Sequence, residues 1–124
     1  MSHEILQPSY VRNDARGTFR EVLNDGHWQA LLSGRMKTDA ILGNHYHKKT
    51  VIFLCLTHGT ALIKTVNVAT GEKDTFQLSG GQGVMLAVNE SHLIRFLEES
   101  EFIMLKSLPY DAADPDTFHF PVED

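Results

Sequence analysis

The sequence predicts an all-β fold. Short runs rich in valine, isoleucine, threonine and phenylalanine alternate apolar and polar residues with a period of two, and turn-forming residues separate the runs at even intervals. The candidate strands are residues 18–23, 28–32, 40–47, 51–56, 61–68, 73–78, 84–88, 92–96 and 102–108. So many short, evenly spaced strands are typical of a sandwich, a jelly roll or a small barrel.

Most of these strands end at a sequence that favours a tight turn. NDG follows the strand at 18–23, and HGT, ATGE, SGGQG and NES separate later strands. Each turn contains a glycine, asparagine or serine, which supplies positive φ or a hydrogen bond from the side chain to the main chain. No internal repeat interrupts the pattern, and no helix is predicted beyond one turn near residues 111–113.

The length of 124 residues indicates a single domain over residues 1–124 with one core. The C-terminal tail, residues 109–124, is polar and contains three prolines, so we expect it to pack on the barrel or on a partner subunit rather than join a sheet. Within it, the sequence DPDT at 114–117 indicates a turn. Because a sheet this small leaves open edges that a second copy usually covers, we expect a homodimer.

Composition excludes several classes of protein. A formal charge of −5 predicts no binding to nucleic acid, since the surface as a whole repels phosphates. No apolar run approaches the length of a membrane span, and the first ten residues lack the features of a signal peptide. The lone Cys55 lies in an apolar run and is expected to be a buried structural thiol. These observations favour a cytoplasmic protein.

The sequence GNHYHKK at 43–49 places two histidines one residue apart in a predicted strand. Because side chains alternate between the faces of a strand, Ile41, Gly43, His45 and His47 are expected on one face and Tyr46 on the other. Two histidines at this spacing also occur on solvated faces. If the face points into a barrel, however, the two imidazoles can converge on one metal or one substrate.

A third histidine belongs with this pair. His92 follows a turn and begins the strand HLIRF, so it shares a face with Ile94 and Phe96, which mark that face as the inner one. This favours a site over a solvated face. The other histidines, residues 3, 27, 58 and 119, are expected in turns, loops or tails.

At these positions the chain resembles the cupins, whose pattern is an HxH pair, a glutamate four or five residues later, a hairpin glycine and a later histidine. Here His45 and His47 match the pair, Gly59 the hairpin glycine and His92 the later histidine. The glutamate positions hold residues 51 and 52, a valine and an isoleucine. The resemblance covers residues 39–96 and implies a cupin double-stranded β-helix, which is a jelly-roll barrel. It does not imply a reaction, because one fold carries many functions.

Further resemblances point to nucleotide-sugar chemistry. DARGTFRE at 14–21 is similar to the DxRGxFxE opening of the dTDP-4-dehydrorhamnose 3,5-epimerases, in which the ILGNHYHKK segment corresponds to the catalytic His-Tyr pair. HxHKK is similar to the HAHK run of the dTDP-sugar 3,4-ketoisomerases, and GNHYHKKT to the GNHWH run in the cupin domain of capsular-polysaccharide sugar reductases. The resemblance implies a small nucleotide-linked keto-sugar as substrate, His45 as general base and Arg16 in a phosphate-facing motif.

Imidazole chemistry is compatible with an isomerase or epimerase of polysaccharide or deoxysugar biosynthesis. Removing a proton beside a ketone needs a base with a pKa near neutrality. His45 can take the proton, and His47 or Tyr46 can return one. Lysines can stabilise the enolate, and cationic side chains can bind the diphosphate. The candidates for these cationic roles are Arg16, Arg35, Lys48, Lys49 and Lys64.

The residues leave four functions open. One is a keto-sugar isomerase or epimerase that needs no metal, and another is a metal-dependent isomerase. The third is a three-histidine metal oxygenase, and the fourth is a sugar-binding cupin without catalysis. If a metal binds, the expected ligands are His45, His47 and His92, and neutral imidazoles suit zinc, iron or nickel. The missing glutamate removes an anionic ligand.

Overall fold

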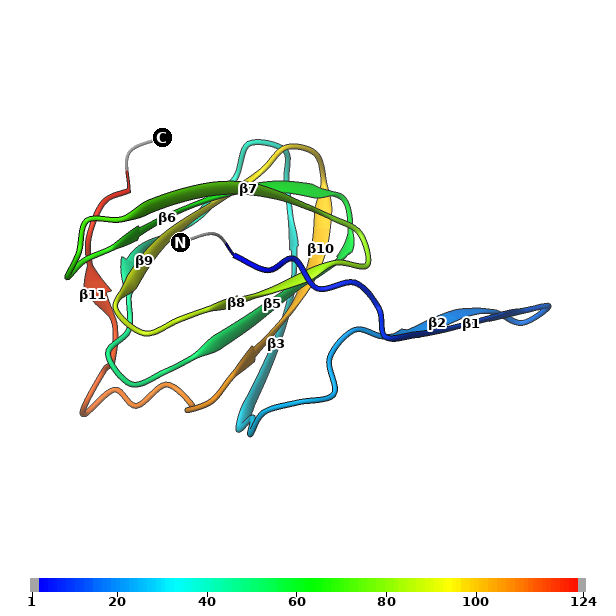
Figure 1. Cartoon of the computed structure of the whole chain (residues 1–124), viewed down its shortest axis with the longest axis horizontal. Coiled ribbons are helices and arrows are strands. Elements are labelled where there is room, and N and C mark those ends of the chain that lie inside the picture. The colour runs from blue at the N-terminus through cyan, green and yellow to red at the C-terminus, as the bar shows by residue number, and fades with distance from the viewer. Residues whose placement is uncertain (1–2, 123–124) are drawn as a thin grey trace.

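Two β-sheets face each other in the computed structural model, which describes residues 3–122, and a separate two-stranded sheet projects from them (Figure 1). The four-stranded sheet has the order β3 (Ala30–Met36), β10 (Ser100–Lys106), β5 (Ile52–His58) and β8 (Gly83–Leu86). The five-stranded sheet has the order β11 (Phe118–His119), β4 (Ile41–Tyr46), β9 (Glu90–Phe96), β6 (Thr60–Asn67) and β7 (Lys73–Ser79). The projecting sheet pairs β1 (Tyr10–Asp14) with β2 (Gly17–Glu21).

The all-β prediction is confirmed, since residues 3–122 contain strands and turns but no helix. The nine predicted strands correspond to β2–β10, with ends that differ by a few residues. All strand pairs are antiparallel. Two strands, β1 and β11, were not predicted.

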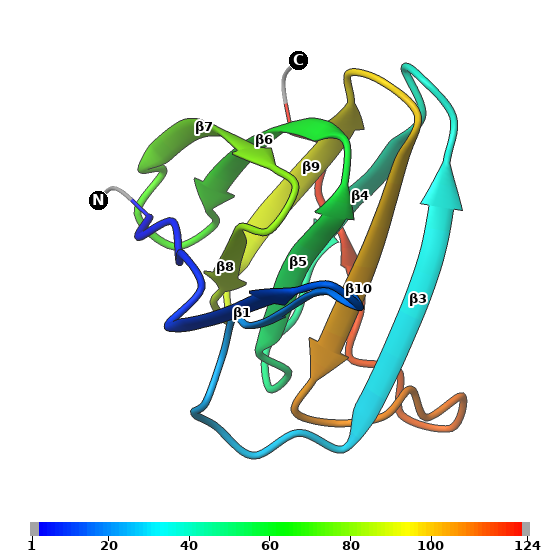
Figure 2. The same cartoon turned by 90° about the vertical axis from the view of Figure 1, so that its right-hand side faces the viewer.

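The hydrophobic core lies between the two large sheets. Alternate residues of β5 and β6 point into it, and so do residues of β9 and β10. Its buried members are Ile52, Leu54, Leu56, Ala61, Ile63, Leu78, Val84, Leu86, Ile94, Phe96 and Phe102. Figure 2 shows β3, β10 and β5 side by side along one wall of this barrel. Cys55 is buried and free, as expected of a structural thiol.

The hairpin of β1 and β2 extends away from the barrel, and every residue in it is exposed (Figure 1). The chain before it is tied to the barrel by a two-way main-chain bridge between Leu6 and Gly83. His3, which was expected in a tail, is instead held between two carboxylates. Its Nδ1 lies 2.6 Å from Asp74 Oδ2 and its Nε2 lies 2.8 Å from Glu90 Oε1.

The described part of the C-terminal tail, residues 109–122, meets the edge of the five-stranded sheet, and residues 123–124 lie outside the described residues. The prediction that it joins no sheet is wrong for two residues, because Phe118 and His119 of β11 pair with Tyr46 and His45 of β4. Without β11, β4 would be the edge of this sheet, so the tail meets unpaired main-chain groups there.

A candidate three-histidine site

The β4 strand turns His45 and His47 into the barrel by means of a bulge. Gly43 pairs with Leu93 of β9 and His45 with His92, so Asn44 is an extra residue in the ladder. Asn44 has φ 61° and Gly43 has φ 107°. The bulge reverses the alternation of faces. The expectation that Ile41 shares a face with His45 is therefore wrong. Ile41 is exposed, whereas the next residue, Leu42, packs on the core.

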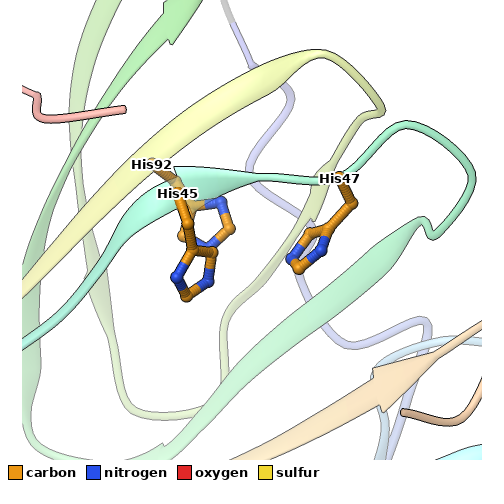
Figure 3. A group of neighbouring side chains, drawn as sticks. All are labelled: His45, His47 and His92. Carbon is orange, nitrogen blue, oxygen red and sulfur yellow. The ribbon is translucent and has the colours of Figure 1, made fainter. Parts of the chain in front are cut away.

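His92 stands directly beside His45 on the neighbouring strand, and the three imidazoles gather on the inner face of the sheet (Figure 3). Their ring centroids are 4.8 Å apart for His45 and His92, 5.2 Å for His45 and His47, and 5.9 Å for His47 and His92. His47 and His92 are buried, whereas His45 is partly exposed. His45 is therefore the most exposed of the three side chains.

The orientation of the His47 ring is fixed by the C-terminal tail. Its Nδ1 lies 2.5 Å from the main-chain oxygen of Asp116. Because a carbonyl oxygen can only accept, Nδ1 carries the proton, and Nε2 of the neutral ring has the lone pair. Nε2 of His47 is buried without a hydrogen-bond partner among the described residues, and so is Nδ1 of His92. Two imidazole nitrogens are therefore unsatisfied inside the cluster.

Two of the three histidines are held in the neutral form. Burial, and then repulsion by His47, Lys106 and His119, lowers the pKa of His45 from its ordinary value of 6.5. Burial and repulsion by the other two histidines lower the pKa of His92 to about 3. A neutral imidazole can accept a proton or bind a metal, so the cluster is ready for either chemistry at neutral pH.

The Asp116 carboxylate holds the loop that follows His47. It accepts hydrogen bonds from the main-chain N–H groups of Lys48, Lys49 and Thr50, each at 2.8 Å, and from Oγ1 of Thr50 at 2.9 Å. Burial alone would raise the pKa of Asp116, but these hydrogen bonds outweigh it and lower the pKa to about 2. The DPDT sequence predicts a turn, but it gives no sign that Asp116 holds the loop after His47.

Tyr46, a predicted catalytic residue, does not join the cluster. It points to the outer face of the sheet, where its ring lies 5.4 Å from Phe118 and 6.3 Å from Phe120. The cause is the regular alternation that resumes after the bulge, since His45 and His47 on either side of it point inward.

Most of the predicted cationic residues also lie elsewhere. Lys48 places its ammonium group 4.3 Å from the centre of the Phe118 ring, on the outer face. Lys64 alternates with the buried residues Ile63 and Thr65, so it points outward from β6. Lys49 differs from the other two lysines, because it lines a cavity of about 230 Å³ that is also lined by His47.

Each of the two predicted arginines forms an ion pair with a nearby carboxylate. Arg16 lies at the tip of the projecting hairpin, with Nη2 2.7 Å from Asp14 Oδ2, and is highly exposed. Arg35 lies on the outer strand β3, with Nη2 3.4 Å from Glu101 Oε1. Within residues 3–122 neither belongs to the three-histidine cluster or to the cavity beside His47.

Two residues near His45 were not predicted. His119 on β11 pairs with His45, so it lies on the same face of the sheet one strand further out. Lys106 at the end of β10 lines the cavity that His47 also lines. Both contribute to the lowered pKa of His45. The alternation of β10 was visible in the sequence, but the strand β11 that carries His119 was not.

The three histidines have a donor set that fits one divalent transition metal. One ligand atom from each can be chosen so that all three lie within 4.8 Å of one another, and two buried nitrogens have no other partner. Tetrahedral zinc with bonds of ~2.1 Å to nitrogen holds its ligands about 3.4 Å apart, so the three rings would move closer together on binding it. The position of the expected glutamate is taken by Ile52, which is buried and apolar.

Comparison with known proteins agrees with this fold. Residues 12–118 match the family model described as the polysaccharide biosynthesis C-terminal domain. No curated protein matches the sequence at a significant level. The described part of the chain, residues 3–122, has no helix suited by length and apolar content to crossing a membrane.

Solved structures with the same fold include enzymes of nucleotide-sugar chemistry. A 3,4-ketoisomerase from Helicobacter canadensis has a TM-score of 0.79 at 20% identity, covering 94% of this chain and 89% of that one. The dTDP-4-dehydrorhamnose 3,5-epimerase from Sulfolobus tokodaii has a TM-score of 0.75 at 17% identity, with coverages of 91% and 79%.

The capsular polysaccharide assembling protein CapF from Staphylococcus aureus has a TM-score of 0.70 at 24% identity. That match covers 91% of this chain but only 32% of CapF, so the chain spans about a third of the length of that relative. The all-strand barrel, its histidine cluster and the family match over residues 12–118 lead to one conclusion. The chain belongs to the polysaccharide biosynthesis C-terminal domain family and has the cupin fold.

Proposed function

We propose that the chain is an isomerase or epimerase of a nucleotide-linked keto-sugar and that it moves a proton on the carbon beside the ketone. The observation that carries the proposal is the position of His45, a neutral and partly exposed imidazole on the inner wall of the barrel. The substrate class is inferred from the structural neighbours, which include a dTDP-sugar epimerase and a ketoisomerase.

His45 acts as the general base in this proposal. It takes the proton from the carbon beside the ketone, and the electrons of that C–H bond form a carbon–carbon double bond while the carbonyl oxygen becomes an enolate. His47 is a positioning residue, because its ring is fixed by Asp116. His92 is buried against His45 and stays neutral, so it adds no positive charge beside the base.

The placement of the titratable groups favours isomerisation over inversion. His119 lies on the same face of the same sheet as His45, while Tyr46 points to the opposite face. A substrate resting on this wall meets both imidazoles from one side. The proton removed there is returned from the same side to the former carbonyl carbon, and the hydroxyl proton of the carbon that lost it passes to the former carbonyl oxygen. The carbon that lost its hydrogen becomes the new carbonyl carbon, so the ketone moves by one position. Epimerisation is the alternative, and it needs a donor on the far side.

Incubation with dTDP- and UDP-linked 4-keto-6-deoxy sugars in deuterated water tests the proposal. We expect a product with the ketone moved to the adjacent carbon and solvent deuterium at the former carbonyl carbon. Deuterium at an inverted carbon would indicate epimerisation. His45→Ala should abolish exchange while the circular dichroism spectrum stays unchanged. Full exchange by that variant would contradict the role of His45.

A metal-dependent form of the same reaction is the second candidate, favoured by the two buried nitrogens without partners. His45, His47 and His92 would hold the ion, which when bound would supply a Lewis acid that polarises the ketone. The residues retain their positioning roles in this case. Asp116 still fixes which nitrogen of His47 faces the cluster.

We also propose that the protein is a homodimer in which the projecting hairpin packs on a second copy. Tyr10 and Phe19 lie on one face of the hairpin, each more than half exposed, with their rings 6.2 Å apart. Leu31 on the edge strand β3 is 68% exposed. A two-stranded sheet with apolar residues open to water is marginal by itself, and a second copy of the chain would cover it.

A further inference from the structure

Lys106 lies on the inner face of the barrel. It is the last residue of β10 and pairs with Ile52 of β5. Phe102 and Met104 of the same strand pack in the core, and alternation places Lys106 on their face. Lysine rarely points into a barrel, because burying an ammonium group costs free energy unless an anion accompanies it.

The side chain of Lys106 reaches the cavity beside the histidine cluster, because Lys106 and His47 line the same cavity. Within residues 3–122 no carboxylate forms an ion pair with it. The residue directly opposite is Ile52, 2% exposed and apolar, at the position where the cupin pattern has a glutamate. The cation is therefore available to a ligand.

We propose that Lys106 is a catalytic residue that binds the carbonyl oxygen of the keto-sugar and stabilises the enolate. This inference rests on the proposed function. When His45 takes the proton, the electron pair of the C–H bond forms the carbon–carbon double bond, and the π electrons of the carbonyl move to its oxygen. The ammonium group donates a hydrogen bond to that oxygen, whose charge exists only after the proton has left.

The location opposite the histidine wall suits this role. β10 and β4 belong to the two facing sheets, so a sugar in the barrel would lie between His45 on one wall and Lys106 on the other. Base and oxyanion donor then approach the reacting carbons from different directions, and the ammonium group is already positively charged when negative charge develops on the oxygen.

The test compares Lys106→Met, Lys106→Gln and Lys106→Arg in the deuterium-exchange assay, with Lys37→Met as a matched control. Lys37 is an exposed lysine in the turn between β3 and β4. We expect both neutral variants to lower kcat by roughly 100-fold to 1,000-fold with KM within about threefold, as for loss of an oxyanion donor. Lys106→Arg should recover part of the rate. Lys37→Met should match the wild type.

The outcomes separate the two proposals. If the wild type exchanges deuterium and His45→Ala does not, but the neutral Lys106 variants keep kcat within about threefold, Lys106 has no catalytic role. A raised KM with unchanged kcat would overturn the role as well, because it would show uniform substrate binding. Absence of exchange by the wild type with every keto-sugar tested would overturn the proposed function and, with it, the role of Lys106. Thermal unfolding of each variant confirms that the comparison is between folded proteins.

Discussion

The main-chain oxygen of Asp116 accepts a hydrogen bond from Nδ1 of His47 at 2.5 Å, and the carboxylate of Asp116 binds the loop directly after that histidine. One residue of the tail therefore sets both the ring orientation and the path of the chain that carries it. Such partners determine which imidazole nitrogen is available for chemistry.

Replacement of Asp116 should destabilise the protein. Asp116→Ala removes four hydrogen bonds to a charged acceptor, so we expect the free energy of unfolding to fall by about 2–4 kcal/mol. Asp116→Asn should cost less, because one oxygen still accepts. Urea denaturation measures both. Asp114→Asn is the control, since its exposed ion pair with Lys49 should contribute less than about 1 kcal/mol. Equal losses in the free energy of unfolding for the substitutions at residues 114 and 116 would show that Asp116 does not hold the loop.

Gly43 should tolerate no side chain. A Cβ there would lie 2.2 Å from the main-chain oxygen of His92, and φ is 107°. We expect Gly43→Ala to destabilise the fold by roughly 3 kcal/mol and to separate the two strands of the site. Gly71→Ala has a similar positive φ of 78° but open space, so it should cost only about 1 kcal/mol. A thermal shift for Gly43→Ala no larger than that of Gly71→Ala would show that the bulge adapts.

Zinc should bind through the three histidines and leave when one is removed. We expect elemental analysis to find zinc in wild-type protein after incubation and washing, and at least tenfold weaker binding in His92→Ala. Ile52→Glu should restore an anionic ligand and raise zinc affinity, although it should destabilise the metal-free protein. Zinc retained by His92→Ala with unchanged affinity would rule out this ligand set.

Alkaline pH should loosen the N-terminal segment. Burial alone would lower the pKa of His3, but its hydrogen bonds to Asp74 and Glu90 outweigh burial and raise it above 6.5. The stabilisation by His3 is therefore complete below pH 6.5 and is lost as pH rises through the raised pKa, because the neutral ring can donate to only one carboxylate.

Amide hydrogen exchange of residues 4–6 measures this effect. Protection factors should be higher at pH 6 than at pH 9 in the wild type and equal at the two pH values in His3→Gln. If protection in the wild type does not change with pH, His3 does not act as a charged link.

The homodimer should depend on the hairpin. Light scattering should give a dimeric mass for the wild type and a monomeric mass for Phe19→Glu, because the substitution replaces one of the two exposed aromatic rings of the hairpin with a charge. Leu97→Glu, in the turn between β9 and β10, is the matched control and should stay dimeric. A monomeric wild type at working concentration would remove the homodimer proposal.

Local patterns in the sequence were sufficient for most of the fold. Period-two alternation and turn residues located β2–β10. They also predicted that His92 shares an inner face with Ile94 and Phe96, and both of these residues are buried. Alternation also indicated that Tyr46 points away from the histidines. These features depend on neighbours along one strand, which a sequence displays directly.

The remaining features depend on contacts between distant segments. The bulge at Asn44 could not be located, because the asparagine gives no local sign that the ladder has an extra residue. Asp116 looked like a turn residue, since its four donors are more than sixty positions away. Lys106 was visible as part of a strand, but its place on the inner face could be found only by knowing which face of β10 meets the core.

The bulge residue Asn44 also anchors the tail that carries Asp116. Its main-chain oxygen accepts from the N–H of Phe120, and its Oδ1 accepts from the N–H of Val122, both at 2.9 Å. Hydrogen bonds thus link the bulge to the tail and the tail to the loop after His47. They should open together as one cooperative unit of local unfolding, so a disturbance at either end of the tail would reach the imidazoles without any change in the rest of the barrel.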